Sequence, residues 1–329
     1  MTSQVAPVSL AVLQHPVRPE LDRVSDELAR IVRSDFPLIG DANAHLLQMR
    51  GKLFRPTLLL LAAQAVDRLD HRKVTLAATV ELIHVATLVH DDSVDHSALR
   101  RGQPTINARF SHQIAVIMGD YLYSHAIIEL VRLGDLDPLR VMSRVTNEMT
   151  VGEMRELDAH DVLDYPEESY DALIMAKTAS LMSGACEVGA HDGDQGDRDA
   201  LRRYGLHLGM AFQITDDLLD YTETESVTGK PTGLDLREHK ITLPLILALP
   251  QMSPEERATV ERLMSDLRPP DSLINTVIAT VEARGGIAAA RARAAEFAAR
   301  AHVELQALPA GVAREALADC ITYSIERRS

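Results

Sequence analysis

The chain has 329 residues, of which 46% are hydrophobic and 25% charged, a composition typical of a folded globular protein. The formal net charge of −14 argues against a nucleic-acid partner, because phosphate backbones attract basic surfaces. Aromatic residues make up only 4% and Trp is absent, so aliphatic side chains must fill the core, which favours helices packed on helices.

No targeting segment or membrane span is expected. The first residues do not combine a charged start with a long apolar run, as a secretory signal would. The apolar stretch 58–66 is much shorter than the ~20 residues that span a bilayer. Cys186 and Cys320 lie in apolar, helix-like segments, which favours free thiols over a disulfide framework. We therefore expect a cytoplasmic protein.

The chain is expected to be helical almost throughout. Residues 1–18 contain two prolines and should form a loose lead-in. Beyond them, apolar residues recur at spacings of three and four, which predicts helices. The predicted helices cover 20–34, 43–49, 55–68, 74–92, 112–133, 137–158, 168–190, 197–221, 242–249, 254–267, 271–284, 286–307 and 311–327. Segment 221–241 is polar and glycine-bearing and should form a loop over a ligand. Without strands or linkers, residues 19–329 are predicted to form one all-α domain.

An acidic motif, D-D-x-x-D, occurs twice, once as Asp91, Asp92 and Asp95 and again as Asp216, Asp217 and Asp220. Each copy follows an apolar helix-like run, so its first and last Asp share one helix face. Like charges stacked in this way repel and weaken a helix. Mg²⁺ takes oxygen ligands and typically bridges one or two carboxylates to phosphates. The repeated motif therefore predicts that these aspartates bind metal ions around a diphosphate between two helices.

Cationic side chains accompany both motifs, as diphosphate binding would require. They are Lys52, Arg55, Arg100, Arg101, Lys177, Lys230 and Lys240. Taken singly, each is ordinary surface charge, and a lone D-D-x-x-D is usually a solvated acidic face. The combination favours a site for two diphosphates.

From Gly51 to its C-terminus the chain resembles the trans-isoprenyl diphosphate synthases, also called polyprenyl synthetases. The resemblance rests on motifs that stand in the order of the family. They are Gly51-Lys52-x-x-Arg55-Pro56, His84, Asp91-Asp92-x-x-Asp95, Arg100-Arg101-Gly102-x-Pro104-Thr105, Gly119-Asp120-Tyr121-Leu122, Lys177-Thr178, Gln213-x-x-Asp216-Asp217-x-x-Asp220, Gly229-Lys230 and Asp235-Leu236-x-x-x-Lys240-x-Thr242-Leu243-Pro244. Arg50 and His239 depart from the pattern, since glycine is common at both positions. Neither change removes a charged ligand, so both bear on geometry rather than on activity.

By this resemblance the fold is a helical bundle of the isoprenoid synthase type around a central active-site cavity. The enzyme would be a prenyltransferase that holds about three Mg²⁺ ions with its two acidic motifs. An allylic diphosphate would ionise and be attacked by isopentenyl diphosphate, and a proton would then pass to the released pyrophosphate. Successive head-to-tail additions would give an all-trans polyprenyl diphosphate of medium or long chain. A homodimer is the assembly that the resemblance implies.

The resemblance also assigns roles to substrate-binding residues. Isopentenyl diphosphate would bind Lys52, Arg55, His84 and Arg101, whereas Arg100, Lys177, Lys230 and Lys240 would contact the allylic diphosphate. Thr178 and Gln213 would direct oxygen dipoles at the allylic cation, an electrostatic contribution to catalysis. Arg327 or Arg328 could reach the isopentenyl site, although tail arginines are usually solvated.

Product length should depend on the helix that carries Asp91. Ala86 and Thr87 lie one turn before the motif and Ile83 a turn deeper, so they would line the channel for the growing chain. Short-chain members usually carry bulky aromatics at the first two positions. The small residues therefore predict about six to ten isoprene units, roughly C30 to C50. Close helix packing would also explain small residues, Tyr121 or Tyr123 could form the floor, and the alternative product is about C15 to C25.

Other interpretations explain less of the chain. Glu81-x-x-His84 has the spacing of di-iron bundles, but these need two such pairs. His90-Asp91 would suit a metal-dependent phosphohydrolase and leaves the second acidic motif unexplained. A class I terpene cyclase usually has an Asn/Ser/Glu triad second and no isopentenyl site. Non-catalytic subunits of two-component synthases typically lack the acidic motifs, so this chain could instead be the catalytic half of a heteromer. The primer, the pathway and any peripheral membrane contact for product release stay open.

Overall fold

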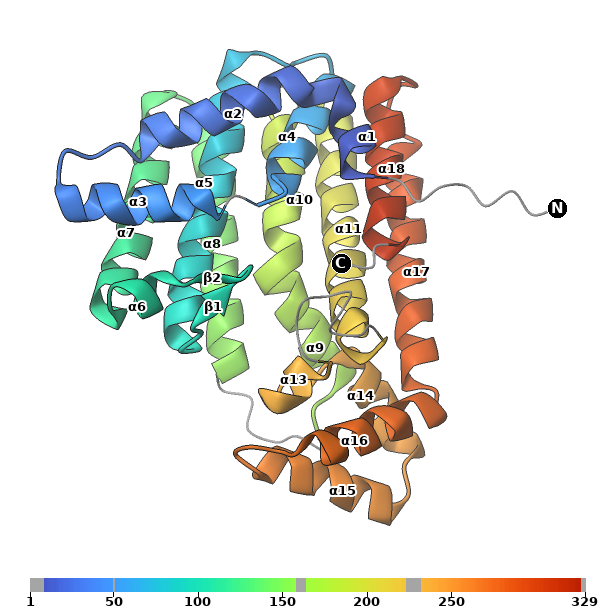
Figure 1. Cartoon of the computed structure of the whole chain (residues 1–329). Coiled ribbons are helices and arrows are strands. Elements are labelled where there is room, and N and C mark those ends of the chain that lie inside the picture. The colour runs from blue at the N-terminus through green and yellow to red at the C-terminus, as the bar shows by residue number, and fades with distance from the viewer. Residues whose placement is uncertain (1–8, 50, 158–163, 223–231, 327–329) are drawn as a thin grey trace.

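The computed structural model describes residues 9–49, 51–157, 164–222 and 232–326 (Figure 1). In chain order, its helices and strands are α1 (Leu10–Gln14), η1 (His15–Val17), α2 (Arg18–Ile31), α3 (Pro37–Gln48), α4 (Phe54–Ala65), α5 (His71–Val94), β1 (Leu99–Arg100), β2 (Gln103–Pro104), α6 (Ile106–Arg109), α7 (His112–Arg132), α8 (Leu136–Leu157), α9 (Glu167–Ile174), η2 (Met175–Ala179), α10 (Ser180–Gly189), α11 (Gln195–Thr222), α13 (Leu234–Arg237), α14 (Leu243–Ala248), η3 (Leu249–Gln251), α15 (Pro254–Ser265), α16 (Asp271–Ala283), α17 (Gly286–Leu305) and α18 (Val312–Glu326).

The predicted all-α fold is confirmed. Within the described ranges the only strands are β1 and β2, a two-residue antiparallel pair in which Leu99 faces Pro104. Helix α5 begins after Asp70, whose carboxylate accepts hydrogen bonds from the backbone of Arg72 and Lys73, an ordinary N-cap. The apolar periodicity of the sequence was therefore a reliable guide to the long helices.

The predicted loose lead-in is wrong for residues 10–17, which form α1 and η1. Leu13 and Val17 are fully buried. Gln14 donates through Nε2 to the carbonyl of Lys52 (2.8 Å) and to Thr57 Oγ1 (3.0 Å). This short segment thus supports the turn that carries Lys52.

One large hydrophobic core fills the bundle, and a smaller cluster lies beneath it. Helix α11 packs most extensively against α17 and α10, and α5 against α7. The smaller cluster comprises side chains from the end of α11 and from α13 to α16, among them Leu245, Val260 and Ile274. Figure 1 shows α15 and α16 below the long helices, and α14 contacts both α11 and α16. Helices α5 and α11 both end toward this lower side of the bundle.

The predicted helix 168–190 is divided into α9, η2 and α10, because Met175–Ala179 forms a wider π-helical turn. Such turns occur frequently at functional sites. Gly209 of α11 allows η2 to approach closely, since a Cβ atom there would lie 2.5 Å from the Cα atom of Ala179. The close contact brings the turn that carries Lys177 and Thr178 against α11.

Candidate functional site

The two acidic motifs lie at the C-terminal ends of α5 and α11, at the same end of the bundle (Figure 1). Asp95 and Asp216 are exposed, and Asp91 and Asp220 are half-buried. These first and last aspartates of each motif share a helix face, as predicted. We call Asp91, Asp95, Asp216 and Asp220 the acidic site.

The second aspartate of each motif is buried and bonded within the protein, and both are only 6% exposed. Asp92 accepts hydrogen bonds from Arg100, whose Nε and Nη2 atoms lie 2.9 and 2.8 Å from Oδ1. Asp217 accepts them from the Tyr170 hydroxyl (2.6 Å) and from Gln213 Nε2 (2.8 Å). Asp92 and Asp217 are therefore both bonded to neighbouring side chains within the protein. Arg100 is the partner of Asp92.

Negative charge accumulates at the acidic site. Burial, together with the charge of Glu153, raises the pKa of Asp91 to about 7. Burial also raises the pKa of Asp217, which its hydrogen bonds from Tyr170 and Gln213 lower only in part. The pKa of Asp235 is also raised, first by burial and then by the negative charges of Asp217 and Asp220. Crowded carboxylates of this kind need a counter-charge.

The donor set fits a hard divalent cation, since carboxylate oxygens are the ligands that Mg²⁺ and Ca²⁺ prefer. In the part of the chain that the structure describes, no three His, Cys, Asp or Glu side chains are placed to hold one ion together. Diphosphate oxygens and water would have to complete the coordination, as is usual for Mg²⁺.

Lys177 and Thr178 lie on η2, which packs against α11, the helix that carries the second acidic motif. The Lys177 ammonium is 2.6 Å from Glu153 Oε2 and donates a still shorter hydrogen bond to Glu156. Burial disfavours its charge, but these two carboxylates more than offset that effect and raise the pKa of Lys177. Thr178 donates through Oγ1 to Gln213 Oε1 at 2.8 Å. The predicted residues Lys177, Thr178 and Gln213 are thus brought together.

Residues after the second motif close this side of the site. The Asp220 carboxylate accepts the backbone N–H groups of Leu234 (2.9 Å) and Asp235 (3.0 Å), at the start of α13. Burial lowers the pKa of Lys240, but Glu238, Glu156 and Asp95 outweigh it and raise the pKa overall. His239 has a φ of 58°, a left-handed conformation that glycine adopts more easily. Lys230 and Gly229 lie outside the described residues.

Three of the four residues predicted to bind isopentenyl diphosphate form a separate group, which we call the cationic corner: the two arginines Arg55 and Arg101, with the imidazole of His84 beside them. Arg55 Nη1 lies 3.1 Å from His84 Nε2, and Arg55 Nε has no hydrogen-bond partner. Burial, reinforced by Arg55 and Arg101, lowers the pKa of His84 well below its usual value. Burial likewise lowers the pKa of Arg55 to about 10. Desolvated cations with an unsatisfied donor are what an anion site requires.

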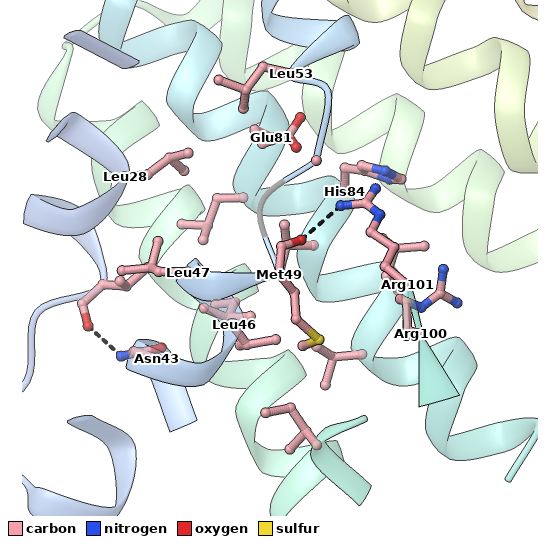
Figure 2. A pocket seen from close by; sticks show the side chains of 18 of the residues that line it. Leu28, Asn43, Leu46, Leu47, Met49, Leu53, Glu81, His84, Arg100 and Arg101 are labelled. Atoms are coloured by element: carbon pink, nitrogen blue, oxygen red, sulfur yellow. Dashed lines mark hydrogen bonds between the residues drawn. The ribbon is translucent and has the colours of Figure 1, made fainter. Parts of the chain in front are cut away.

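Figure 2 shows the Arg101 guanidinium beside His84, where it donates through Nη1 to the carbonyl of Met49 at 2.8 Å. Lys52 is exposed and its ammonium lies 5.9 Å from the ring centroid of Tyr323. Phe54 stacks on Phe212 with ring centroids 5.7 Å apart. Phe54 also lies against Tyr323, with ring centroids 5.8 Å apart, so the ring beside Lys52 is packed on the core. Arg327 and Arg328 lie outside the described residues.

A cavity of about 80 Å³ lies between α2, α3 and α5 and borders the cationic corner, because His84 and Arg101 are among its lining residues (Figure 2). It is lined mainly by aliphatic side chains, and Glu81, Val85 and Leu88 contribute from α5. Residues 83 and 87 project from the opposite side of α5, given about 100° of rotation per residue. The cavity is therefore distinct from the predicted product channel, which Ile83 and Thr87 would line.

The positions predicted to set chain length differ in their surroundings. Ile83 and Ala86 are buried, and Thr87 is half-buried and donates through Oγ1 to the carbonyl of His84 (2.8 Å). The Tyr121 hydroxyl reaches the carbonyl of Val32 (3.3 Å) on the α2 side. Tyr123 is exposed, with its hydroxyl 3.3 Å from Thr146 Oγ1. Of these side chains, Thr87 is the one that combines partial exposure with a position one turn before Asp91.

Two of the competing interpretations lose support. His84 Nε2 lies 3.1 Å from Arg55 Nη1, so a cationic side chain already contacts the imidazole nitrogen that a metal ion would need. His90 lies 3.2 Å from the carbonyl of Val116 and 3.4 Å from Asp120, both on α7. A di-iron centre and a His-Asp phosphohydrolase site are therefore not formed by these residues.

Four site residues were not predicted from the sequence with a role: Glu153, Glu156, Tyr170 and Asp235. Glu153 and Glu156 are one helical turn apart, a spacing that in itself indicates only a polar helix face. Tyr170 reaches Asp217 from a different helix, so no local pattern could reveal it. Asp235 could have been found, because it belongs to a motif already noted in the sequence.

Comparisons with known proteins point in the same direction. The family model described as polyprenyl synthetase matches residues 36–281. The chain is 38% identical over 298 residues to octaprenyl diphosphate synthase of Escherichia coli (strain K12), covering 90% of this chain and 92% of that protein. It is 33% identical over 311 residues to heptaprenyl diphosphate synthase component 2 of Bacillus subtilis (strain 168), covering 94% and 88%. The structure superposes with a TM-score of 0.93 on the crystal structure of a polyprenyl synthase from Caulobacter crescentus CB15 complexed with calcium and isoprenyl diphosphate, at 33% identity, covering 99% of this chain and 100% of that one.

Proposed function

The chain belongs to the polyprenyl synthetase family, and on that premise we propose that it condenses an allylic diphosphate with isopentenyl diphosphate in successive head-to-tail steps. The product is a medium- or long-chain all-trans polyprenyl diphosphate, in line with the octaprenyl and heptaprenyl synthases to which the chain is similar. The observation that carries the proposal is the presence of two complementary sites. The acidic site would hold metal ions and one diphosphate, and the cationic corner would hold the other.

The acidic site would bind a divalent metal, about three Mg²⁺ ions, through Asp91, Asp95, Asp216 and Asp220. When bound, the metal would act as a Lewis acid that neutralises the diphosphate leaving group. Asp92 and Asp217 would support the site through Arg100, Tyr170 and Gln213 rather than face the substrate.

The residues on η2 and α11 would act on the allylic group itself. The Lys177 ammonium would donate to the diphosphate as its bond to the allylic carbon breaks, and Lys240, and Lys230 beyond the described residues, would assist. The Thr178 hydroxyl donates its hydrogen bond to Gln213 Oε1, which leaves the lone pairs of the hydroxyl oxygen available to the developing cation. The double bond of isopentenyl diphosphate would then form the new carbon–carbon bond, and a proton would pass to the released pyrophosphate.

Replacement of Arg55 by Met should raise the KM for isopentenyl diphosphate about ten- to a hundredfold, because a charge-assisted hydrogen bond to the diphosphate is lost. The KM for the allylic primer should change little, because Arg55 belongs to the cationic corner. Arg284→Met is a suitable control, since Arg284 pairs with Glu256 at the surface. Equal rises in both KM values would show that Arg55 does not select between the two substrates.

The purified chain, incubated with Mg²⁺, labelled isopentenyl diphosphate and a series of allylic primers, should form products of about C30 to C50. Chelation of the metal with EDTA should abolish the reaction. The relative named heptaprenyl diphosphate synthase component 2 raises a second possibility, catalysis within a heteromer. Activity that required a second protein would establish the heteromer, and failure to condense under both conditions would refute the proposed function.

We infer that the chain forms a homodimer through α7 and α8. Ile117 and Val131 share one face of α7 and are 62% and 60% exposed, and Met154 on α8 is 62% exposed. By length and composition alone, α5 and α7 are apolar enough to cross a membrane. The apolar part of α5 is 61% buried inside the protein, whereas that of α7 is only 39% buried, so α7 leaves more apolar surface uncovered. Large exposed apolar faces usually mark interaction sites, and most assemblies are symmetric dimers. Light scattering should give about twice the 36.2 kDa chain mass, and a mass of 36.2 kDa would refute the dimer.

A cytoplasmic location, with peripheral membrane contact for product release, is part of the same proposal. Cys186 and Cys320 are free and buried, which supports a reducing compartment. Fractionation of cells that produce the chain would test it, because a stable pool in another compartment would contradict the expectation.

A further inference from the structure

Lys177 is held by two carboxylates that no motif of the sequence assigns to the site. Glu153 and Glu156 lie on α8, and we call them the α8 carboxylate pair. Their oxygens contact the same ammonium group, Glu153 at 2.6 Å and Glu156 at a shorter distance. The three side chains are 23% to 28% exposed, so they are partly shielded from solvent. This arrangement differs from the exposed ion pairs elsewhere on the surface, which contribute little.

The approach of α8 to η2 depends on Gly152. A Cβ atom at this position would lie 2.8 Å from the Cβ atom of Ala176 and 3.1 Å from Lys177 Cγ, closer than packed atoms come. The glycine directly precedes Glu153, so the close contact also sets where the α8 carboxylate pair points. The geometry is therefore fixed by the packing of two helices rather than by flexible surface side chains.

The pair carries more negative charge than Lys177 can neutralise. Two carboxylates share one ammonium, so the three groups have a net charge of about −1 at neutral pH. An ammonium has three N–H donors, and two are used here, which leaves one for a diphosphate oxygen.

The excess charge is directed toward the acidic site. Helix α8 packs against η2, which carries Lys177, and also contacts α5, which carries Asp91. The negative charges of Glu156 and Asp95 both raise the pKa of Lys240. The pair therefore lies beside Lys177, on a helix that also contacts the helix of the first acidic motif.

We propose that the α8 carboxylate pair is a third acidic element of the site, which positions the Lys177 ammonium and supplies negative charge that attracts divalent cations to Asp91 and Asp95. These are positioning residues, since they act through Lys177 and through the field at the metal ligands. The inference rests on the proposed function, because it concerns the same metal and diphosphate.

Metal binding tests the proposal without relying on turnover. Free Mn²⁺ would be measured by electron paramagnetic resonance during titration of the whole protein in the presence of inorganic pyrophosphate. In Glu153→Gln and Glu156→Gln, the half-saturating Mn²⁺ concentration should rise about three- to tenfold, because each loses one negative charge near the ions. Glu148→Gln is the matched control on the same helix, since Glu148 is 46% exposed, lies 3.9 Å from Arg144 and should leave Mn²⁺ binding unchanged.

A conservative variant separates charge from packing. Glu153→Asp keeps the carboxylate and should retain most of the Mn²⁺ affinity that Glu153→Gln loses. Unchanged half-saturation in both Gln variants, with only their thermal stability altered, would reduce the pair to a structural ion pair and overturn the proposal. Condensation by the wild-type protein is measured separately. If the wild type is active but the Gln variants bind Mn²⁺ as it does, this inference is contradicted and the proposed function still holds.

Discussion

Substitution of Asp91 or Asp216 by Ala should lower kcat/KM for condensation by about a thousandfold or more. Each aspartate is the first residue of its motif and belongs to the acidic site, so under the proposed function its loss removes one ligand of the ions that neutralise the leaving group. Several kcal/mol of transition-state stabilisation by charge would disappear with it, and each 1.4 kcal/mol is about a factor of ten in rate.

The stability of the Asp91→Ala variant should not fall with its activity. The pKa of Asp91 is raised to about 7, chiefly by burial, which means that the folded state disfavours the ionised form when no metal is bound. Removing the carboxylate should therefore leave the thermal unfolding midpoint of the metal-free protein unchanged or slightly higher. Asp22→Ala provides a control at an exposed aspartate paired with Arg18. Normal turnover in the Asp91 and Asp216 variants would contradict the assignment of the acidic site.

Replacing Thr87 by Phe should shorten the products from roughly C30–C50 to about C25 or less. Thr87 lies one helical turn before Asp91 and is half-buried, so a large ring there can block the path of the growing chain. Ala86 is buried, and a Phe at that position would overpack the core at a cost of about 1–3 kcal/mol. Thr87 is therefore the better site for the experiment.

The opposite face of α5 offers a matched control for product length. Val85 lines the 80 Å³ cavity that borders the cationic corner, so Val85→Phe inserts the same ring into space away from the predicted channel. Labelled products would be dephosphorylated and separated by chain length. An unchanged distribution in Thr87→Phe, or equal shortening in Val85→Phe, would remove Thr87 from the control of product length.

The long helices could be predicted because their apolar periodicity is a local property of the sequence. Helix α5, predicted over 74–92, runs from His71 to Val94, and α11, predicted over 197–221, runs from Gln195 to Thr222. Two features escaped prediction because they depend on packing. Helix α1 is only five residues long and is held by contacts such as that of Gln14 with Thr57. The π-helical turn at Lys177 accompanies the close approaches at Gly209 and Gly152.

The site divides in the same way. The acidic motifs and the main cations could be named from the sequence, because their types and spacing carry the chemistry. Their partners could not, because they come from other helices: Tyr170 contacts Asp217, and the α8 carboxylate pair contacts Lys177. The sequence also could not show that the second aspartate of each motif is engaged within the protein.

The most direct test of the account is a crystal structure of the protein with Mn²⁺ and inorganic pyrophosphate. Anomalous scattering would locate the ions independently of any assumption about the site. We predict Mn²⁺ peaks in contact with Asp91 and Asp95 on one side and Asp216 or Asp220 on the other, with pyrophosphate between them. Ions bound elsewhere, or pyrophosphate held without metal contact to either motif, would contradict the central claim that the two motifs grip one diphosphate.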